Sequence, residues 1–267
     1  MRCGFIDIHQ HLLYGVDDGA RTLRDAQRML AAACADGVCL VIATPHVAPG
    51  EKPIRTEAFA ARLEKLRAFG ASMGLSVRAL LGAEVLYTPM TCRCLREGRV
   101  PTLGGTGYVL VEFLPDVRYD KLRAALRDIL RSGYIPVVAH VERYACLRPH
   151  RALALKREMD DVLFQMNCSS VVGGNGFFAD RHARRLLDEG LIDAVASDAH
   201  SLHRRPTRMR EAFEALTERY DSIYASNLTG MSDASPLWRA LREALRRPAE
   251  GASASGGSAN GDVPCAR

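Results

Sequence analysis

Two histidines and two aspartates are crowded into one short stretch near the start of the chain. In FIDIHQHLLYGVDDGA, residues 5–20, His9 and His11 end an apolar run, and Asp17 and Asp18 follow in a polar loop. Side chains at positions i and i+2 of a strand point to the same face, so the two imidazoles should converge. Imidazoles and carboxylates gathered in this way can bind a divalent metal ion or transfer protons.

Ionisable side chains recur at the ends of five later apolar runs, and Asp198 and His200 repeat the i, i+2 spacing. A single buried histidine is most often a hydrogen-bonded core residue. Burying this many ionisable groups without a counter-ion, however, would cost on the order of several kcal/mol for each. Divalent cations are the simplest compensation, and the number of ligands indicates more than one ion. The candidate metal ligands are His9, His11, Asp18, His46, Glu84, Glu112, His140, Asp198 and His200.

Other polar residues lie close to these positions in the sequence. Asp7 either holds an imidazole in one tautomer or is a buried, hydrogen-bonded acid, and Asp17 is interpreted as a loop residue. Arg143 and Arg205 are candidate catalytic residues, since a guanidinium beside a metal cluster suits a phosphate oxygen. Glu142 is interpreted as a salt-bridge partner.

Alternating strands and helices must position these side chains. Seven short runs are rich in Val, Ile and Leu without strict alternation, as expected of strands buried on both faces. Helical segments lie between them, such as the one that Thr22 should cap and Gly37 should end. This pattern predicts a parallel α/β architecture, either a closed barrel with its site at the carboxyl ends of the strands or an open doubly wound sheet. The predicted strands are 5–9, 38–46, 77–85, 108–113, 135–140, 162–167 and 193–200.

Composition narrows the protein class. A chain of 267 residues that is 48% hydrophobic and 25% charged fits one globular domain. We predict that this domain spans residues 1–248 and that the glycine-rich residues 249–267 form a disordered tail. The net charge of +5 comes without a basic block that contains aromatic residues, which argues against nucleic-acid binding.

Apolar run lengths and cysteine spacing indicate the cellular compartment. No apolar run is long enough to cross a membrane, and no signal peptide is evident. The eight cysteines lack zinc-binding or disulfide-type spacing. We therefore expect a cytoplasmic protein without direct membrane insertion. The sequence also lacks a cysteine-phosphatase motif, a phosphate-binding glycine loop followed by lysine, and a nucleophilic-serine elbow.

Taken together, the motifs resemble a known family. DIHQHLLYGVDDGA, ATPH, GAEVLYTP, LVEF, AHVERY and ASDAH occur in the order found in the polymerase-and-histidinol-phosphatase (PHP) superfamily. VDDG, EVLYTP and HVERY are similar to those of bacterial metal-dependent tyrosine-protein phosphatases encoded with capsular and exopolysaccharide genes. The resemblance covers residues 5 to about 220. It implies a single-domain, distorted (β/α)7 barrel resembling the TIM barrel.

The resemblance also implies roles for the candidate residues. Three divalent ions are expected, most often Mn²⁺, with Fe, Zn or Mg as alternatives. Arg143 matches the catalytic arginine, and Arg205 matches a second arginine near the phosphate. Residues 167–176 and 221–234 depart from the family pattern. The implied ligand sets are His9, His11, Glu84 and Asp198 for the first ion, Glu84, Glu112 and His140 for the second, and Asp18, His46 and His200 for the third.

The predicted function follows from this resemblance. We expect hydrolysis of phosphotyrosine by metal-activated water, on the tail of a membrane-associated bacterial tyrosine kinase that controls capsular or exopolysaccharide synthesis. One alternative is a histidinol-phosphate or other small-molecule phosphomonoesterase of the same superfamily. A non-catalytic scaffold is a further alternative, but such a protein would be expected to lose ligands, and every matched ligand is present.

Overall fold

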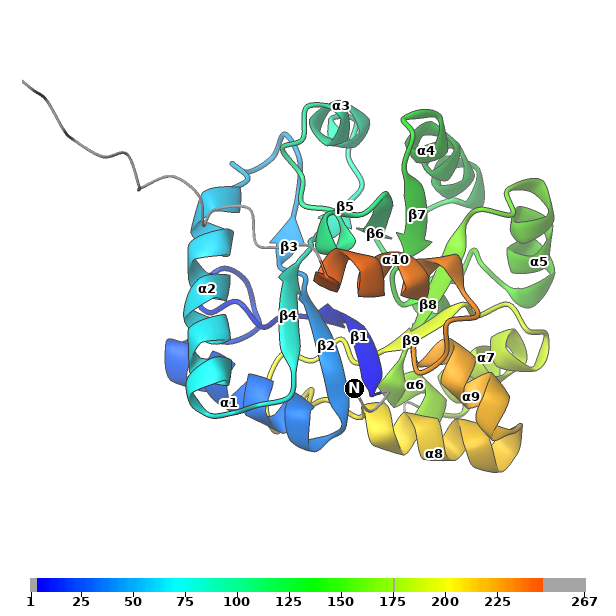
Figure 1. The fold of residues 1–267 in the computed structure, drawn as a ribbon. Helices are drawn as coiled ribbons and strands as arrows, with labels where there is room; N and C mark the ends of the chain where they lie inside the picture. The colour runs from blue at the N-terminus through cyan, green and yellow to red at the C-terminus, as the bar shows by residue number, and fades with distance from the viewer. Residues whose placement is uncertain (1–3, 175, 247–267) are drawn as a thin grey trace, which may run out of the picture.

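Parallel strands alternate with helices along the chain in the computed structural model, which describes residues 4–174 and 176–246 (Figure 1). The strands are β1 (Phe5–Gln10), β2 (Val38–Ala43), β3 (His46–Val47), β4 (Arg78–Leu81), β5 (Glu84–Leu86), β6 (Tyr108–Glu112), β7 (Ile135–Val138), β8 (Leu163–Asn167) and β9 (Ala194–Ala196). The α-helices are α1 (Leu23–Ala35), α2 (Thr56–Ser72), α3 (Thr91–Arg96), α4 (Tyr119–Arg131), α5 (Pro149–Glu158), α6 (Cys168–Val172), α7 (Phe177–Asp188), α8 (Met209–Arg219), α9 (Ser222–Leu228) and α10 (Pro236–Arg246). Two 3-10 helices are η1 (Leu103–Gly105) and η2 (Val141–Arg143).

Two of the predicted strands are each broken in the middle. The run 38–46 forms β2 and β3, and the run 77–85 forms β4 and most of β5. The strands therefore divide into one sheet of order β1-β2-β4 and another of order β3-β5-β6-β7-β8-β9. Pro45 lies at the first break, where it cannot donate a ladder hydrogen bond. Backbone bonds from Gly82 N to Ala43 O (2.9 Å) and from Glu84 N to Pro45 O (3.0 Å) join the two sheets across the breaks.

The sheet curls until its last strand returns to its first. Gln10 of β1 forms an isolated parallel bridge with Ala199, just beyond β9. His11 N donates to Ala199 O (2.9 Å), and Asp198 N donates to His9 O (2.8 Å). With β2–β3 and β4–β5 each counted as one strand, the result is the distorted seven-stranded barrel that the sequence predicted. The open doubly wound alternative is wrong.

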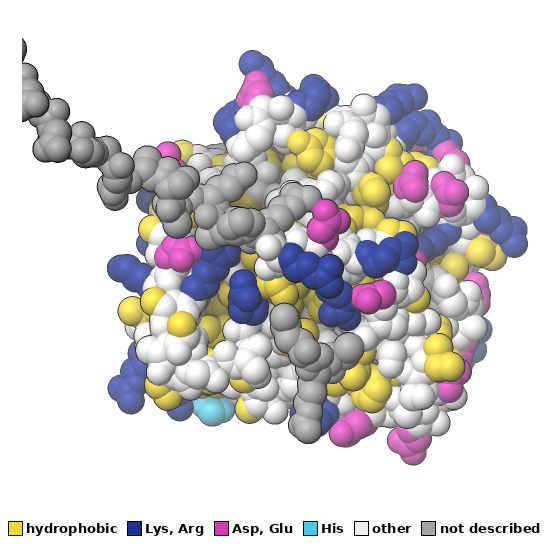
Figure 2. All heavy atoms as spheres, in the orientation of Figure 1, with side chains coloured by type: hydrophobic (Ala, Val, Ile, Leu, Met, Phe, Trp, Pro, Cys, Tyr) yellow, Lys and Arg dark blue, Asp and Glu magenta, His cyan; other side chains and the backbone are white. Residues whose placement is uncertain are grey.

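Helix α10 lies across one end of this barrel, on the side where β1 begins (Figure 1). Its Leu237, Trp238 and Leu241 are completely buried and pack with apolar side chains of the strands, such as Ile6 and Ile8. Figure 2 shows the same side of the molecule, with basic side chains gathered over α10 and acidic ones among them. The amphipathic helix therefore closes the amino-terminal end of the barrel and leaves the carboxyl ends of the strands for the polar residues.

The other helices mostly follow the predicted pattern. Thr22 caps α1 by accepting a hydrogen bond from Asp25 N, and Gly37 follows the helix with a φ of 95°. Helix α9 was not predicted; the Asp221 side chain caps it by accepting from Tyr224 N (2.7 Å). The last predicted strand, 193–200, is shorter than expected, because β9 ends at Ala196. The predicted tail, 249–267, lies outside the described residues.

Replacement of Trp238 should destabilise the barrel severely. The side chain is fully buried, and its Nε1 donates to Asn227 O (2.7 Å). Trp238→Ala should lower the free energy of unfolding by about 3–5 kcal/mol, because it leaves a cavity beneath the strands. Urea unfolding of purified protein measures this change, with Arg246→Ala at an exposed position of α10 as the control. A loss below about 1 kcal/mol would contradict the proposed role of α10.

Candidate metal centre

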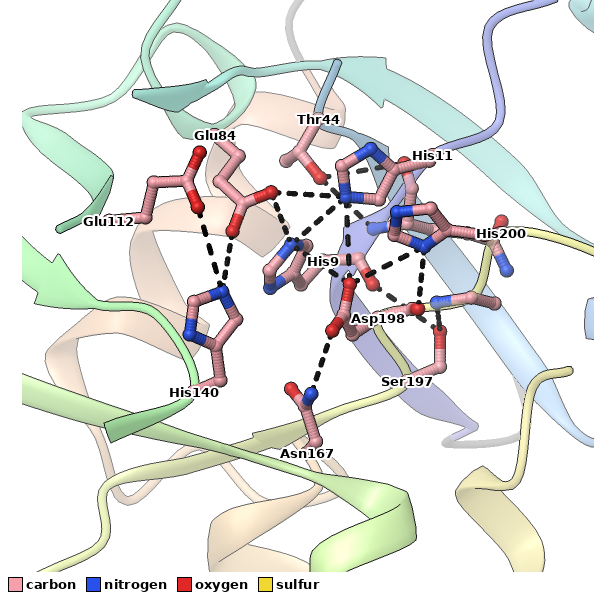
Figure 3. Close-up of polar contacts among 12 residues, drawn as sticks. His9, His11, Thr44, Glu84, Glu112, His140, Asn167, Ser197, Asp198 and His200 are labelled. Atoms are coloured by element: carbon pink, nitrogen blue, oxygen red, sulfur yellow. Dashed lines mark hydrogen bonds and ion pairs between the residues drawn. The ribbon is translucent and has the colours of Figure 1, made fainter. Parts of the chain in front are cut away.

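The candidate ligands converge at the carboxyl ends of the strands, around the buried side chain of Glu84 (Figure 3). Glu84 Oε2 lies 3.1 Å from His9 Nε2, 3.1 Å from His11 Nε2 and 3.1 Å from His46 Nδ1. The other oxygen, Oε1, lies 2.7 Å from His140 Nε2. One carboxylate at the start of β5 thus contacts four imidazoles from three segments of the barrel, namely the end of β1, β3 and the turn after β7.

Two other carboxylates lie toward the edge of the cluster. Asp18 Oδ1 is 3.4 Å from His46 Nε2 and 3.2 Å from His200 Nε2. Glu112 Oε1 is 3.0 Å from His46 Nδ1, and its Oε2 is 4.0 Å from His140 Nε2. The potential ligand atoms form three groups, and the atoms of each group lie within 4.8 Å of one another. These groups are His9, His11 and Glu84; His46, Glu84 and Glu112; and His11, Asp18, His46 and His200.

These groups overlap with the ligand sets that the family resemblance implies, but they are not identical to them. The third expected set is found together, with His11 added to it. In the first set, Asp198 Oδ1 lies farther out, 3.5 Å from His9 Nε2 and 3.6 Å from His11 Nε2. In the second set, His140 contacts Glu84 rather than Glu112. The barrel therefore brings all nine candidates into one cluster, and their individual assignment to ions stays a prediction.

The two candidate catalytic arginines meet on one oxygen of Asp198. Asp198 Oδ2 accepts hydrogen bonds from Arg143 Nη2 (3.0 Å), Arg205 Nη2 (2.5 Å) and Asn167 Nδ2 (2.7 Å). The arginine side chains are 46% and 39% exposed, whereas that of Asp198 is 3% exposed. Although burial opposes ionisation, His9 and the two arginines hold the pKa of Asp198 well below its usual range. A buried carboxylate thus fixes two guanidinium groups at the surface of the cluster.

Charge is unevenly distributed among the imidazoles. Burial works against protonation of His9, but Glu84 and Asp198 raise its pKa to about 10. Burial likewise opposes protonation of His46, whose pKa Glu112 and Glu84 raise to about 9. Burial and the neighbouring His11 lower the pKa of His200 to about 4. The carboxylates therefore demand positive charge within the cluster, which either protons or metal ions can supply.

The donor set fits divalent metal ions. Glu84 Oε2 and His200 Nε2 are buried and have no hydrogen-bond partner among the residues described. The Glu84 oxygen is nevertheless surrounded by three imidazole nitrogens at 3.1 Å. An unsatisfied buried carboxylate oxygen is costly, and coordination of a cation would satisfy it together with its neighbours. Mixed imidazole and carboxylate ligands suit Mn, Fe or Zn.

Two residues of β8 orient the cluster and were missed in the sequence. Gln165 Oε1 accepts from His9 Nδ1 (3.1 Å) and from His140 N (2.9 Å). Gln165 Nε2 donates to Asn167 Oδ1 (2.9 Å), and Asn167 in turn donates to Asp198. Both side chains are buried. Their i, i+2 spacing at the end of an apolar run is the same signal that identified His9. Buried neutral amides, however, do not require a counter-ion, so the argument from buried charge does not point to them.

Asp17 also has a larger role than that of a loop residue. Its Oδ2 accepts from His11 Nδ1 (2.8 Å) and from His46 N (3.1 Å), and its Oδ1 accepts from Gly19 N (3.0 Å). Although burial favours the neutral acid, the hydrogen bond from His11 lowers the pKa of Asp17. This ionised carboxylate fixes the tautomer of His11 so that Nε2 faces Glu84.

The structure decides between the two interpretations of Asp7. It accepts from Ser197 N (2.9 Å), Ser197 Oγ (2.6 Å) and the backbone of His9 (3.4 Å), and it makes no hydrogen bond to an imidazole ring. Asp7 is therefore a buried, hydrogen-bonded acid that connects β1 to the end of β9. Burial raises its pKa to about 6.

The interpretation of Glu142 as a salt-bridge partner is wrong. Its Oε1 accepts from Ser170 Oγ (2.7 Å) and from Asn167 N (3.2 Å), and it forms no ion pair within the described part of the chain. The carboxylate faces inward toward α6 because η2 turns it away from the exposed side chain of Arg143.

Two of the candidate ligands occupy unusual backbone conformations. His140 has a φ of 35° and Asp198 a φ of 53°, and no other non-glycine residue of 4–174 or 176–246 has a positive φ. Left-handed conformations are unfavourable for such residues and occur most often at functional sites. The hydrogen bond from His140 N to Gln165 and the three bonds to Asp198 Oδ2 hold these conformations in place.

The distorted parallel barrel with histidines and carboxylates gathered at its strand ends fits the PHP class of metal-dependent phosphatases. Within this class, the chain belongs to the CpsB/CapC family of capsular polysaccharide synthesis, whose sequence model matches residues 5–236. This match confirms the resemblance drawn from the sequence motifs.

Individual relatives support the same assignment. Tyrosine-protein phosphatase CpsB of Streptococcus pneumoniae is 30% identical over 230 residues, which cover 84% of this chain and 94% of the relative. Tyrosine-protein phosphatase YwqE of Bacillus subtilis is 30% identical over 224 residues, which cover 84% and 88%. Among solved structures, the crystal structures of YwqE and CpsB, described as unique metal-dependent tyrosine phosphatases, include a chain with a TM-score of 0.75 at 30% identity. That alignment covers 82% of this chain and 89% of the solved one.

Removal of the Gln165 amide should weaken metal binding. Gln165→Leu keeps the approximate volume but deletes the acceptor for His9 Nδ1 and His140 N, so the ring of His9 and the backbone of His140 both lose a hydrogen bond that holds them in place. Loss of such supporting hydrogen bonds typically lowers metal affinity about 10–100-fold. Equilibrium dialysis of purified protein against Mn²⁺ measures the affinity, and Gln165→Glu, which keeps the acceptor oxygen, serves as the control. An unchanged affinity in Gln165→Leu would exclude this role.

Proposed function

We propose that this protein hydrolyses phosphotyrosine in a protein substrate, with divalent metal ions held by the nine candidate ligands. The observation that supports this most directly is the buried Glu84 oxygen, which faces three imidazole nitrogens without a hydrogen-bond partner. The family membership and the names of the relatives point to the same reaction.

The bound ions would supply an activated water for attack on phosphorus and would offset the negative charge of the phosphoryl group. The protein's own contribution is to position that group. Each guanidinium has five N–H donors, and Arg143 and Arg205 each direct only one amine nitrogen at Asp198. Apart from Arg205 Nη1, which lies 3.9 Å from Asp18 Oδ2, the remaining donors can bind phosphoryl oxygens. Anchoring to a buried carboxylate reduces the orientation entropy lost on binding.

We further propose three divalent ions, most often Mn²⁺, with Fe, Zn or Mg as alternatives. The three groups of converging ligand atoms support this number. Glu84 would be shared between two of the ions, because its two oxygens face different imidazoles. Asp17 and Gln165 would keep the Nε2 atoms of His11 and His9 directed at the ions.

The proposed substrate is the phosphotyrosine-containing tail of a membrane-associated bacterial tyrosine kinase, approached from the cytoplasm. The association of the family with capsular polysaccharide synthesis supports this partner. Within the described ranges, no helix is long and apolar enough to cross a bilayer. The exposed arginines at the site suit a phosphate group presented on another protein.

The substrate class and the metal requirement can be tested together. Protein stripped of metal should be inactive, and added Mn²⁺ should restore hydrolysis of phosphotyrosine peptides more effectively than Mg²⁺, Zn²⁺ or Fe²⁺. Phosphate release from a phosphotyrosine peptide and from histidinol phosphate is measured in parallel for each metal. Preference for histidinol phosphate would refute the protein substrate, and full activity of the metal-free protein would refute the metal centre.

Substitutions at the centre should remove activity without unfolding the protein. His140→Ala deletes a proposed metal ligand, and Arg143→Ala deletes a guanidinium proposed to donate hydrogen bonds to the phosphoryl oxygens. Each should lower kcat for a phosphotyrosine peptide by about 10²-fold or more, as loss of an aligned transition-state donor does. His150→Ala, at an exposed position of α5, should leave kcat unchanged. Circular dichroism confirms folding, and wild-type turnover by His140→Ala would contradict the proposal.

A further inference from the structure

A pocket of about 830 Å³ lies directly beside the metal centre. Asp18, His200 and Arg205 belong both to the cluster and to the lining of this pocket. The rest of the lining comes from the start of α1 and from the loop between β9 and α8. Anything bound at the phosphate-binding arginines would therefore extend past the mouth of this pocket.

The pocket is strongly basic. Arg21, Arg28 and Arg204 line it together with Arg205 and His203, whereas its acidic residues are Asp18 and Asp25. Arg21, Arg28 and Arg204 are all exposed. The apolar side chains of Met29 and Leu202 also line the pocket. A cationic rim over an apolar wall is suited to a peptide that carries negative charge.

Within 4 Å, the two acids form one ion pair with the pocket arginines, between Asp18 Oδ2 and Arg205 Nη1 at 3.9 Å. Hydrogen bonds from Thr22, and then the charges of Arg28 and Arg21, lower the pKa of Asp25, but neither arginine forms an ion pair with it within that distance. Asp18 faces His46 and His200 at 3.4 and 3.2 Å. Asp25 accepts from Thr22 N (3.0 Å) and Thr22 Oγ1 (2.8 Å), as part of the cap of α1.

Three guanidinium groups therefore remain available. Within residues 4–174 and 176–246, Arg21, Arg28 and Arg204 make no ion pair shorter than 4 Å. Some surface arginines elsewhere are paired, as Arg208 is with Glu211 and Arg219 with Asp188. What distinguishes Arg21, Arg28 and Arg204 is that they line the pocket beside the candidate metal centre.

We propose that this pocket binds an anionic side chain of the substrate polypeptide that flanks the phosphotyrosine. This inference rests on the proposed phosphatase function and extends it to the sequence around the target residue. The flanking anion is a carboxylate or a second phosphate, because the guanidinium fork matches both. Excess positive charge beside the centre also raises the local concentration of acidic substrates.

The test compares three phosphotyrosine peptides of equal length, with neutral, glutamate or second-phosphotyrosine flanks. Mn²⁺-loaded wild-type protein should show a higher kcat/KM on the two anionic peptides, chiefly through KM, and the preference should shrink as NaCl is raised. In the double variant Arg21→Gln/Arg28→Gln, the ratio of anionic to neutral kcat/KM should fall about tenfold, because each exposed charge pair contributes a few-fold and two such pairs are removed. Arg204→Gln should lower the same ratio a few-fold.

Arg24→Gln is the matched control, because Arg24 is exposed on the same helix but does not line the pocket. It should keep the wild-type ratio. Since each ratio is taken within one protein preparation, partial misfolding of a variant cancels. If the pocket variants lower the ratio only for the doubly phosphorylated peptide, the pocket binds a second phosphate. If they lower the ratio for both anionic peptides, the pocket binds carboxylates as well as phosphates.

Three results would overturn the inference. Equal wild-type kcat/KM on all three peptides, or an equal loss on all three in the double variant, would show that the pocket does not read the flanking sequence, while leaving the phosphatase proposal intact. Failure of the metal-loaded wild-type protein to hydrolyse any of the peptides would overturn both proposals together.

Discussion

The rest of the structure depends on the burial of one carboxylate among imidazoles. Glu84 is 1% exposed, and four histidine rings from three segments of the chain face its two oxygens. Such a charge is tolerated only where positive partners surround it, so every strand that contributes a ring must end at the same height in the barrel. The breaks after β2 and β4 and the return of the last strand to β1 meet this requirement.

A second set of contacts holds the rings in the orientation that the carboxylates require. Asp17 fixes His11, and Gln165 fixes both the ring of His9 and the backbone of His140. These partners come from the loop after β1 and from β8, on either side of the cluster. Because Asp198 in turn anchors both arginines, the candidate metal ligands and the candidate catalytic arginines form one connected network.

The exposed surroundings of the cluster differ from its interior. Inside, charges are matched; in the adjoining pocket, Arg21, Arg28 and Arg204 form no ion pair within 4 Å among the described residues. Exposed charges contribute little to stability, so these positions are free to vary without cost to the fold. Their place beside the cluster is what motivates the proposed role in substrate selection.

The sequence alone indicated a parallel α/β architecture and the candidate ligands at the strand ends, because strand-end positions and i, i+2 spacing are local properties of the chain. The residues left a closed barrel and an open sheet undecided, and the family resemblance favoured the barrel. Tertiary structure alone decided which partners orient those residues. Gln165 and Asp17 act on histidines that the barrel brings to them, and Glu142 turns inward instead of pairing with an arginine. Hydrogen bonds between distant segments depend on closure of the barrel, and no spacing along the sequence encodes the direction in which a side chain meets its neighbour.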